Sequence, residues 1–254
     1  MLFRSFPSHD TEAGTINVNI PILHNRYVDK VLKSNSYEEL MWRFLEAASP
    51  SKEISESYAA FSNMKKVCKI SDYTWLHIGD GGYTRTAAIF AFFSKSLNFS
   101  IDPNLNFNKF NAWSLKYGVF GVIPRDKKFE DVSERNILNE ILFQSLDKEY
   151  SSNYNICCVH AHINLEEVDK QYPRWEFLYT NPCCKPGTQV FSKKYMYENN
   201  IVEVENKLDL GILSDKRHII IYRKKHTISV NELVEVPPIS SNRVKRIMEE
   251  MPVI

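Results

Sequence analysis

The chain has 254 residues, of which 43% are hydrophobic and 25% are charged, and its 32 Lys and Arg residues nearly balance 31 Asp and Glu residues. This composition is that of a globular chain with a packed core, and it excludes intrinsic disorder over the whole length. The formal net charge of +1 excludes a globally basic nucleic-acid-binding arm, although a local basic patch is still compatible with it. The length suits one large domain, or one domain with an extension.

The sequence predicts neither a membrane span nor a secreted protein. The most apolar run, residues 87–93, is far shorter than the ~20 residues that a spanning helix needs. The first residues have no apolar core of signal-peptide length, and the early acidic Asp10 and Glu12 argue against an organelle presequence. The five cysteines are an odd number and include two adjacent pairs, which makes a poor disulfide framework. We therefore expect a cytoplasmic protein that does not bind membranes.

The first part of the chain is predicted to lie outside the main domain. Residues 1–30 have the pattern of an extended arm. Residues 36–39 fit a helical capping box and are followed by apolar residues at helical spacing. A second helix is predicted over 59–67. We expect residues 1–57 to form an N-terminal arm with a helical extension.

From residue 58 onward, short β-rich runs alternate with helical patterns. The predicted strands cover residues 73–78, 98–101, 117–123, 155–162 and 175–179. The predicted helices cover residues 84–96, 133–146 and 165–172, and Thr84 is the expected N-cap of the first one. Strands that alternate with helices predict a parallel sheet with both faces covered.

The end of the chain changes to an antiparallel pattern. Residues 201–213 and 218–223 are strand-like, and the polar turn 214–217 separates them. The predicted fold is therefore a three-layer α/β domain over residues 58–236, with a mostly parallel sheet and a C-terminal antiparallel hairpin. A helical tail is expected over residues 237–254.

The strongest functional signal is the glycine-rich turn at 79–82, which lies between a predicted strand and a predicted helix. Glycine tolerates positive φ and lets a ligand approach the backbone closely. Asp102 follows the next strand, where a carboxylate is placed to accept hydrogen bonds from ribose hydroxyls. The Gly-x-Gly-x-x-Gly dinucleotide pattern fails at Thr84, and Asp80 within the turn is unfavourable beside a pyrophosphate. An acidic turn suits a ligand that carries an ammonium group.

With these features, the chain from about residue 58 to 223 resembles a divergent class I S-adenosylmethionine (SAM)-dependent methyltransferase. In that family an acidic, glycine-rich loop holds the methionine part of SAM, an acidic residue after the second strand holds the ribose, and a Rossmann-like sheet of seven strands closes with an antiparallel hairpin. The resemblance implies SAM as the cofactor. The residues that it implies for cofactor binding are Gly79, Asp80, Gly81, Gly82 and Asp102.

Two residues near the ends of later strands are candidates for the acceptor side. His160 opens the His-Ala-His sequence that ends the predicted fourth strand, where this family meets the methyl acceptor, and it could act as a general base. Asn181 opens Asn-Pro-Cys-Cys, which is similar to the family's Asn-Pro-Pro-aromatic motif although it follows the fifth strand. The resemblance therefore implies His160 and Asn181 as catalytic residues. In the competing interpretation, His160 is a histidine satisfied by its neighbours at a strand end, the glycine turn is an ordinary strand–helix turn, and Asp102 is a turn residue before proline.

A metal site on the same rim is not predicted. His160, His162, Cys183 and Cys184 follow neighbouring strands, and two His with two Cys is a zinc ligand set. Adjacent cysteines rarely bind one ion together, however, and the spacings fit neither a zinc ribbon nor a zinc finger.

The sequence leaves two main functions open. The first is an enzyme that transfers a methyl group from SAM to an unidentified acceptor. The second is a non-catalytic Rossmann-like protein that binds a partner or holds an assembly, because a fold does not by itself establish an activity. A different nucleotide-dependent enzyme at the same rim is a third. Short basic clusters would suit a nucleic-acid acceptor, but acidic residues lie near each of them and the net charge does not support one.

Overall fold

The computed structural model describes residues 3–4, 20–21, 24–35, 37–111, 121–144, 154–159, 161–182 and 189–225. Most of the expected N-terminal arm and all of the expected tail at 237–254 lie outside these ranges. Within the arm, the two-residue strands β1 (Phe3–Arg4) and β2 (Ile20–Pro21) pair antiparallel. None of the helices in the described ranges is long and apolar enough to cross a membrane.

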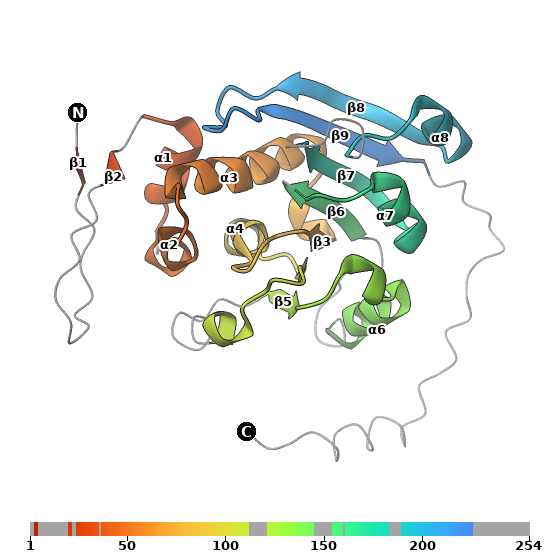
Figure 1. The fold of residues 1–254 in the computed structure, drawn as a ribbon, viewed down its shortest axis with the longest axis horizontal. Coiled ribbons are helices and arrows are strands. Elements are labelled where there is room, and N and C mark those ends of the chain that lie inside the picture. The colour runs from red at the N-terminus through yellow and green to blue at the C-terminus, as the bar shows by residue number, and fades with distance from the viewer. Residues whose placement is uncertain are drawn as a thin grey trace, which may run out of the picture.

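Seven strands form the central sheet, in the order β5-β4-β3-β6-β7-β9-β8 (Figure 1). Their bounds are β3 (Thr74–Ile78), β4 (Asn98–Ile101), β5 (Val122–Arg125), β6 (Tyr154–Val159), β7 (Trp175–Asn181), β8 (Ile201–Leu208) and β9 (His218–Lys224). Strands β3 to β7 pair parallel to one another, whereas β9 runs antiparallel to both β7 and β8. The predicted mostly parallel sheet with a C-terminal antiparallel hairpin is therefore confirmed.

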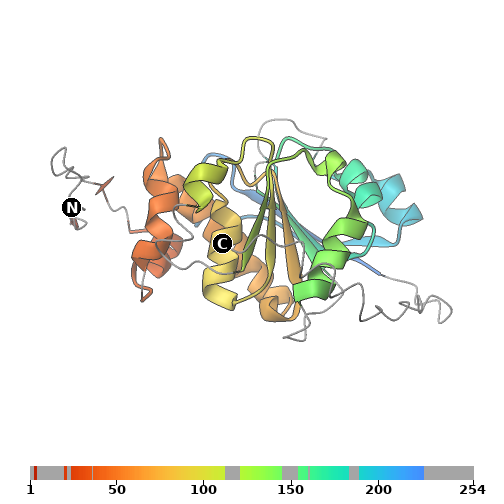
Figure 2. The ribbon, with the colours of Figure 1, turned by 90° about the horizontal axis from the view of Figure 1, so that it is seen from below.

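Helices cover both faces of this sheet, so the predicted three-layer architecture is also confirmed. Figure 2 shows the sheet between the two helical layers. One layer contains α1 (Arg26–Leu32), α2 (Tyr37–Leu45), α3 (Pro50–Val67) and α4 (Arg85–Ser94). The other contains α6 (Glu134–Gln144), α7 (Leu165–Gln171) and α8 (Lys193–Glu198). Each layer buries its own apolar cluster against the sheet, and this burial is the main favourable term in folding.

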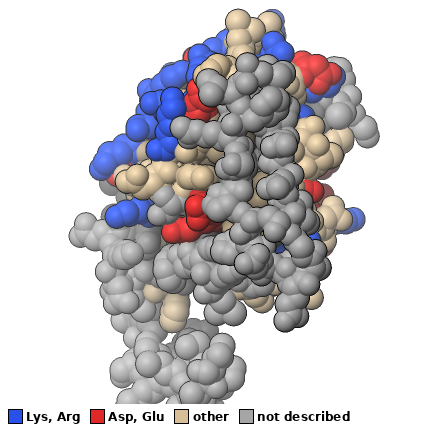
Figure 3. Space-filling model, turned by 90° about the vertical axis from the view of Figure 1, so that its left-hand side faces the viewer, with Lys and Arg blue, Asp and Glu red and all other residues tan. Residues whose placement is uncertain are grey.

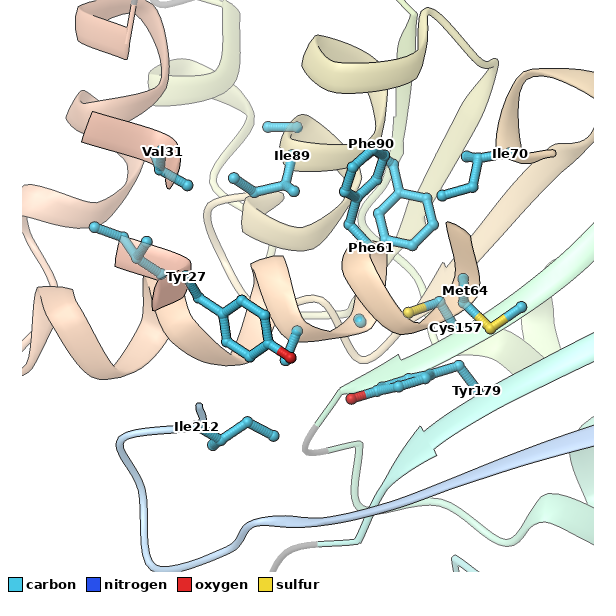
Figure 4. Close-up of a cluster of buried hydrophobic side chains, with 14 of the residues drawn as sticks. Tyr27, Val31, Phe61, Met64, Ile70, Ile89, Phe90, Cys157, Tyr179 and Ile212 are labelled. Atoms are coloured by element: carbon cyan, nitrogen blue, oxygen red, sulfur yellow. The ribbon is translucent and has the colours of Figure 1, made fainter. Parts of the chain in front are cut away.

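The N-terminal helices belong to this core. Figure 4 shows Tyr27 of α1 and Phe61 of α3 in the same cluster as Phe90 of α4 and Tyr179 of β7. The expected boundary at residue 58 falls within α3, whose whole length is one continuous helix. The described helices before residue 58 thus pack on the same face of the sheet as α4.

Several elements differ from the sequence-based expectation: helix α1 begins within the expected extended arm, and strand β5 covers Val122–Arg125 where a strand over 117–123 was predicted. Helix α3 begins at Pro50 and not at residue 59, because its first turns bury the polar residues Ser55, Glu56 and Ser57, which conceal the apolar period. Strand β8 ends at Leu208, and the chain then leaves the sheet so that buried Asp209 can contact α1 and α3. The short helix α8 was not predicted.

Candidate functional site

The glycine turn lies at the topological switch point of the sheet. Strand β3 has β4 on one side and β6 on the other, so the chain leaves β3 in one direction and later returns to its opposite side. In open α/β sheets, ligands bind outside the carboxyl ends of the strands at this point. The turn that follows β3 is therefore where the fold itself favours a ligand.

The first two glycines of this turn have different surroundings. Both have a φ of +72°, which L side chains rarely adopt. A Cβ added to Gly79 would lie 2.7 Å from the Cβ of Ala161, so Gly79 allows close packing against the chain after β6. A Cβ added to Gly81 would have no heavy atom within 4 Å. The backbone of Gly81 is thus the part of the turn that a ligand can approach.

The Asp80 side chain points into the protein and caps helix α4. Its Oδ1 accepts a hydrogen bond from the Thr86 amide at 2.8 Å, and its Oδ2 accepts from the Ala87 amide at 3.1 Å and from the Ser100 hydroxyl at 3.0 Å. Burial raises the pKa of Asp80 to about 6, and these hydrogen bonds oppose that rise. Both carboxylate oxygens of Asp80 therefore accept hydrogen bonds from within the protein and stabilise its fold.

Thr84 is at the predicted N-cap position of α4, but its side chain does not cap the helix. Thr84 occupies the position before the helix, but its backbone is left-handed, with φ of 51° and ψ of 40°, and its side chain makes no capping hydrogen bond. A conventional N-cap residue has an extended backbone, which lets its side-chain oxygen reach the second or third amide of the helix. Asp80 supplies that oxygen from within the glycine turn.

Asp102 lies beside the turn, as the sequence predicted. Its Oδ2 accepts a hydrogen bond from the Gly81 amide at 2.9 Å, and its Oδ1 accepts from the Asn104 amide at 2.8 Å. The residue is 6% exposed at the end of β4. These contacts bring the Asp102 carboxylate to the open face of Gly81 and fix its orientation.

Asn181 ends β7 on the same edge, where it joins β7 to β9. Its Nδ2 donates hydrogen bonds to the carbonyl oxygens of Lys216 at 3.1 Å and His218 at 2.6 Å. Its Oδ1 is buried and has no hydrogen-bond partner among the described residues. The amide thus has one end used by the fold and an acceptor left over, next to Val159 at the end of β6.

The other acceptor-side candidates are only partly described. His160, Cys183 and Cys184 lie outside the described residues, and His162 is exposed. Within the described ranges, no group of three or more His, Cys, Asp or Glu side chains could hold a metal ion.

A buried polar layer beneath the turn was missed by sequence reasoning. His77 of β3 is 1% exposed, and its Nε2 is 2.9 Å from Oδ1 of Asn98 on β4. Burial lowers the pKa of His77 to about 4, so the ring is neutral near pH 7. The available signal was a polar residue within each of two neighbouring buried strands, His77 near the end of β3 and Asn98 at the start of β4.

Comparisons with known proteins find only distant structural likenesses and assign no role to any residue. No family model matches the chain, and no curated protein matches it. Magnesium protoporphyrin IX methyltransferase from Synechocystis PCC 6803, solved with SAM, aligns over 82% of this chain and 100% of its own at 8% identity and a TM-score of 0.48. MtNAS, solved with MTA and tNA, aligns over 80% of this chain and 70% of its own at 11% identity and a TM-score of 0.45. A SAM-dependent methyltransferase of Leishmania major aligns over 78% of this chain and 83% of its own, at 14% identity and a TM-score of 0.42.

Proposed function

We propose that this protein binds SAM at the carboxyl edge of the sheet and transfers its methyl group to an acceptor that has yet to be identified. The observation that carries the proposal is the hydrogen bond between the Gly81 amide and Asp102. It combines an accessible glycine backbone with an oriented carboxylate at the switch point, and these are the two features that a nucleoside with a short zwitterionic tail requires.

Asp102 keeps the capacity to hold a ribose. A carboxylate offers about four lone-pair positions on its two oxygens, and the amides of Gly81 and Asn104 use one on each oxygen. The remaining positions can accept hydrogen bonds from two ribose hydroxyls. Hydrogen bonds of this kind to an ionised acceptor are about twice as strong as neutral ones.

The capped start of α4 favours SAM over a dinucleotide or ATP. A pyrophosphate at such a turn binds the free amides at a helix N-terminus. Here Asp80 already accepts from the amides of Thr86 and Ala87, so a phosphate would meet a carboxylate and no free donor at these two positions. An ammonium group is attracted by the same carboxylate. In this proposal Asp80 acts through its charge and by holding the turn, while Gly79 and Gly82 shape the backbone.

The acceptor side of the proposal rests on Asn181 and His160. Methyl transfer is a direct displacement, to which a protein contributes mainly by aligning donor and acceptor. Among the described residues, the buried Oδ1 of Asn181 at the end of β7 has no hydrogen-bond partner, and we assign it to orienting a donor group of the acceptor molecule. His160 follows directly after β6 in the chain and is proposed as the base that takes up the acceptor's proton.

The test is calorimetric binding of S-adenosylhomocysteine to the full chain and to Asp102→Ala. We expect the variant to bind more weakly by ~1–3 kcal/mol, which is the scale of a lost charge-assisted hydrogen bond. Asp215→Ala is the matched control, because Asp215 is exposed in the β8–β9 connection. Equal affinity of Asp102→Ala and wild type would reject the ribose role. NAD and ATP titrated in parallel distinguish SAM binding from another nucleotide-dependent activity.

The second candidate function is a non-catalytic Rossmann-like protein. It is favoured by the use of Asp80 and of the Asn181 Nδ2 group inside the fold. Figure 3, which looks onto the side of Figure 1 where α1 and α2 lie, shows Lys and Arg gathered along one edge with Asp and Glu among them. Such an edge is compatible with phosphate contacts. Transfer of a labelled methyl group from SAM to RNA, protein and small-molecule fractions separates the two functions, and absence of S-adenosylhomocysteine binding supports the second.

A further inference from the structure

Helix α2 contacts three consecutive residues at the exit of the glycine turn. The Tyr83 hydroxyl donates a hydrogen bond to Oε2 of Glu46, at the end of α2, at 3.0 Å. The Thr84 hydroxyl accepts from Nε of Arg43 at 3.5 Å. The Arg85 Nε in turn donates to the carbonyl oxygen of Arg43 at 2.8 Å. Two side chains of the turn therefore bond to α2 and the residue after it, and one side chain of α2 bonds to the turn.

Thr84 is the residue at which this attachment matters most. A left-handed backbone is uncommon for any residue other than glycine, and for a β-branched side chain it is a genuine outlier. Conformations of this kind persist only when the surrounding structure fixes them. Two other non-glycine residues in the described ranges have positive φ, Lys95 and Asn200, but each lies just after a helix, where such a residue commonly ends it. Thr84 precedes a helix.

Arg43 is the residue of α2 that contacts the Thr84 side chain. Its side chain is completely buried, and its Nη1 donates to the Glu39 carbonyl at 3.3 Å. The positive charge lies within reach of Asp80, whose attraction opposes the effect of burial on the guanidinium. Arg43 thus has partners at Thr84, at the Glu39 carbonyl and at Asp80, and these help to offset the cost of burying its charge.

We propose that Arg43 is a positioning residue for the SAM site: from α2 it holds Thr84 in the left-handed conformation and thereby fixes the glycine turn in the shape that binds the cofactor. This inference rests on the proposed function. It makes the N-terminal helices, which precede the residues that carry the methyltransferase motifs in the sequence, a component of the site.

The experiment uses Arg43→Met, Thr84→Gly and the double variant, all in the full chain. Glycine adopts the left-handed conformation without strain, so Thr84→Gly should no longer need Arg43. If the turn of Arg43→Met has the binding shape only a tenth of the time, its apparent Kd for S-adenosylhomocysteine rises about tenfold. The double variant should recover most of that loss. A role of Arg43 in stability alone would not give this rescue, because folded molecules would bind equally well in every variant.

Amide hydrogen exchange of the protein without ligand is the second readout. Arg43→Met should speed exchange at Gly81, Thr86 and Ala87, whose amides bind Asp102 and Asp80, and the double variant should slow it again. Arg26→Met is the matched control, since Arg26 of α1 pairs with Asp209 and not with the turn. It should leave exchange at these amides unchanged. If wild type does not bind S-adenosylhomocysteine, the proposed function fails, and exchange alone still decides the positioning role.

Two results would overturn the inference. One is unchanged exchange at the three amides in Arg43→Met. The other is faster exchange that Thr84→Gly does not reverse. Should Arg43→Met fail to fold, Arg85→Met breaks the opposite half of the same attachment at a partly exposed residue and is measured in its place.

Discussion

The turn after β3 and the end of β7 each carry a polar side chain that sequence patterns assign to a ligand, and the structure uses the two side chains differently. Asp80 has both oxygens occupied by α4 and β4. Asn181 has its Nδ2 bonded to carbonyl oxygens of Lys216, just before β9, and of His218 in β9, and its Oδ1 has no partner among the described residues. At the first place the proposed ligand contacts therefore fall to Gly81 and Asp102, whereas at the second the proposal keeps the expected residue, Asn181. A polar residue in a motif is thus a candidate only to the extent that the fold leaves it a free atom.

The largest effect in this comparison is expected for Asp80→Ala. The change removes the cap of α4 and leaves the amides of Thr86 and Ala87 and the Ser100 hydroxyl without their acceptor. Loss of a cap and of buried hydrogen-bond partners should lower the free energy of unfolding by ~3 kcal/mol. Urea denaturation measures it. The free energy of unfolding of Asp80→Asn, which keeps one acceptor oxygen, should lie between those of Asp80→Ala and wild type. Full stability of Asp80→Ala would mean that another group caps the helix.

Gly79→Ala and Gly81→Ala test the packed part and the open part of the turn separately. Both add a side chain at positive φ, but only the first meets Ala161, at 2.7 Å. We expect a loss of ~2–3 kcal/mol for Gly79→Ala, from strain and overlap together, and of ~1 kcal/mol for Gly81→Ala, from strain alone. Thermal unfolding compares the two. If Gly81 faces the ligand, its variant should lose affinity for S-adenosylhomocysteine out of proportion to its small loss of stability. The reverse order of stabilities would contradict the described packing.

How far the sequence predicts these features depends on whether the deciding contact is local. Helix α7 and strand β4 lie where periodicity places them, because each is specified by its own run of residues. The left-handed Thr84 could not be predicted, since its conformation is held from α2, 41 residues away in the chain. The same holds for Asn181, whose partners begin 35 residues later. The sequence therefore indicated the edge of the sheet at which the candidate residues meet, but not which of their atoms are left without hydrogen-bond partners among the described residues.

For Asn181→Ala we expect a smaller loss of stability, ~1–2 kcal/mol, because the carbonyls of Lys216 and His218 lose a donor at the edge of the sheet. Asn181→Asp is the informative companion. It has almost the same shape but turns a carboxylate oxygen toward two carbonyl oxygens, so it should be no more stable than the alanine variant. Chemical denaturation tests this order. If Oδ1 also orients the methyl acceptor, Asn181→Ala lowers turnover of the folded enzyme in addition to its stability, and unchanged turnover would remove Asn181 from the catalytic proposal.

The smallest expected effect is the change of folding stability with pH, to which the buried groups of His77 and Asp80 contribute with opposite sign. Burial lowers the pKa of His77 from 6.5 to about 4, so between these values the unfolded chain binds a proton that the folded protein excludes, and stability falls as the pH falls through this window. Burial raises the pKa of Asp80 from 3.8 to about 6, so between those values the folded protein binds the extra proton, and stability rises as the pH falls.

The two contributions oppose each other near pH 5, and single variants should separate them. His77→Gln keeps a donor for Asn98 but does not titrate, so on going from pH 7 to pH 5 it should lose less stability than wild type, by on the order of 1 kcal/mol. Asp80→Asn removes the opposite contribution and should lose more stability than wild type over the same interval. Urea midpoints at several pH values give both slopes, and the comparison uses slopes because Asp80→Asn is less stable at every pH. Parallel slopes in the two variants would show that neither buried group titrates in this range. The two polar residues would then act on the turn through hydrogen bonding alone.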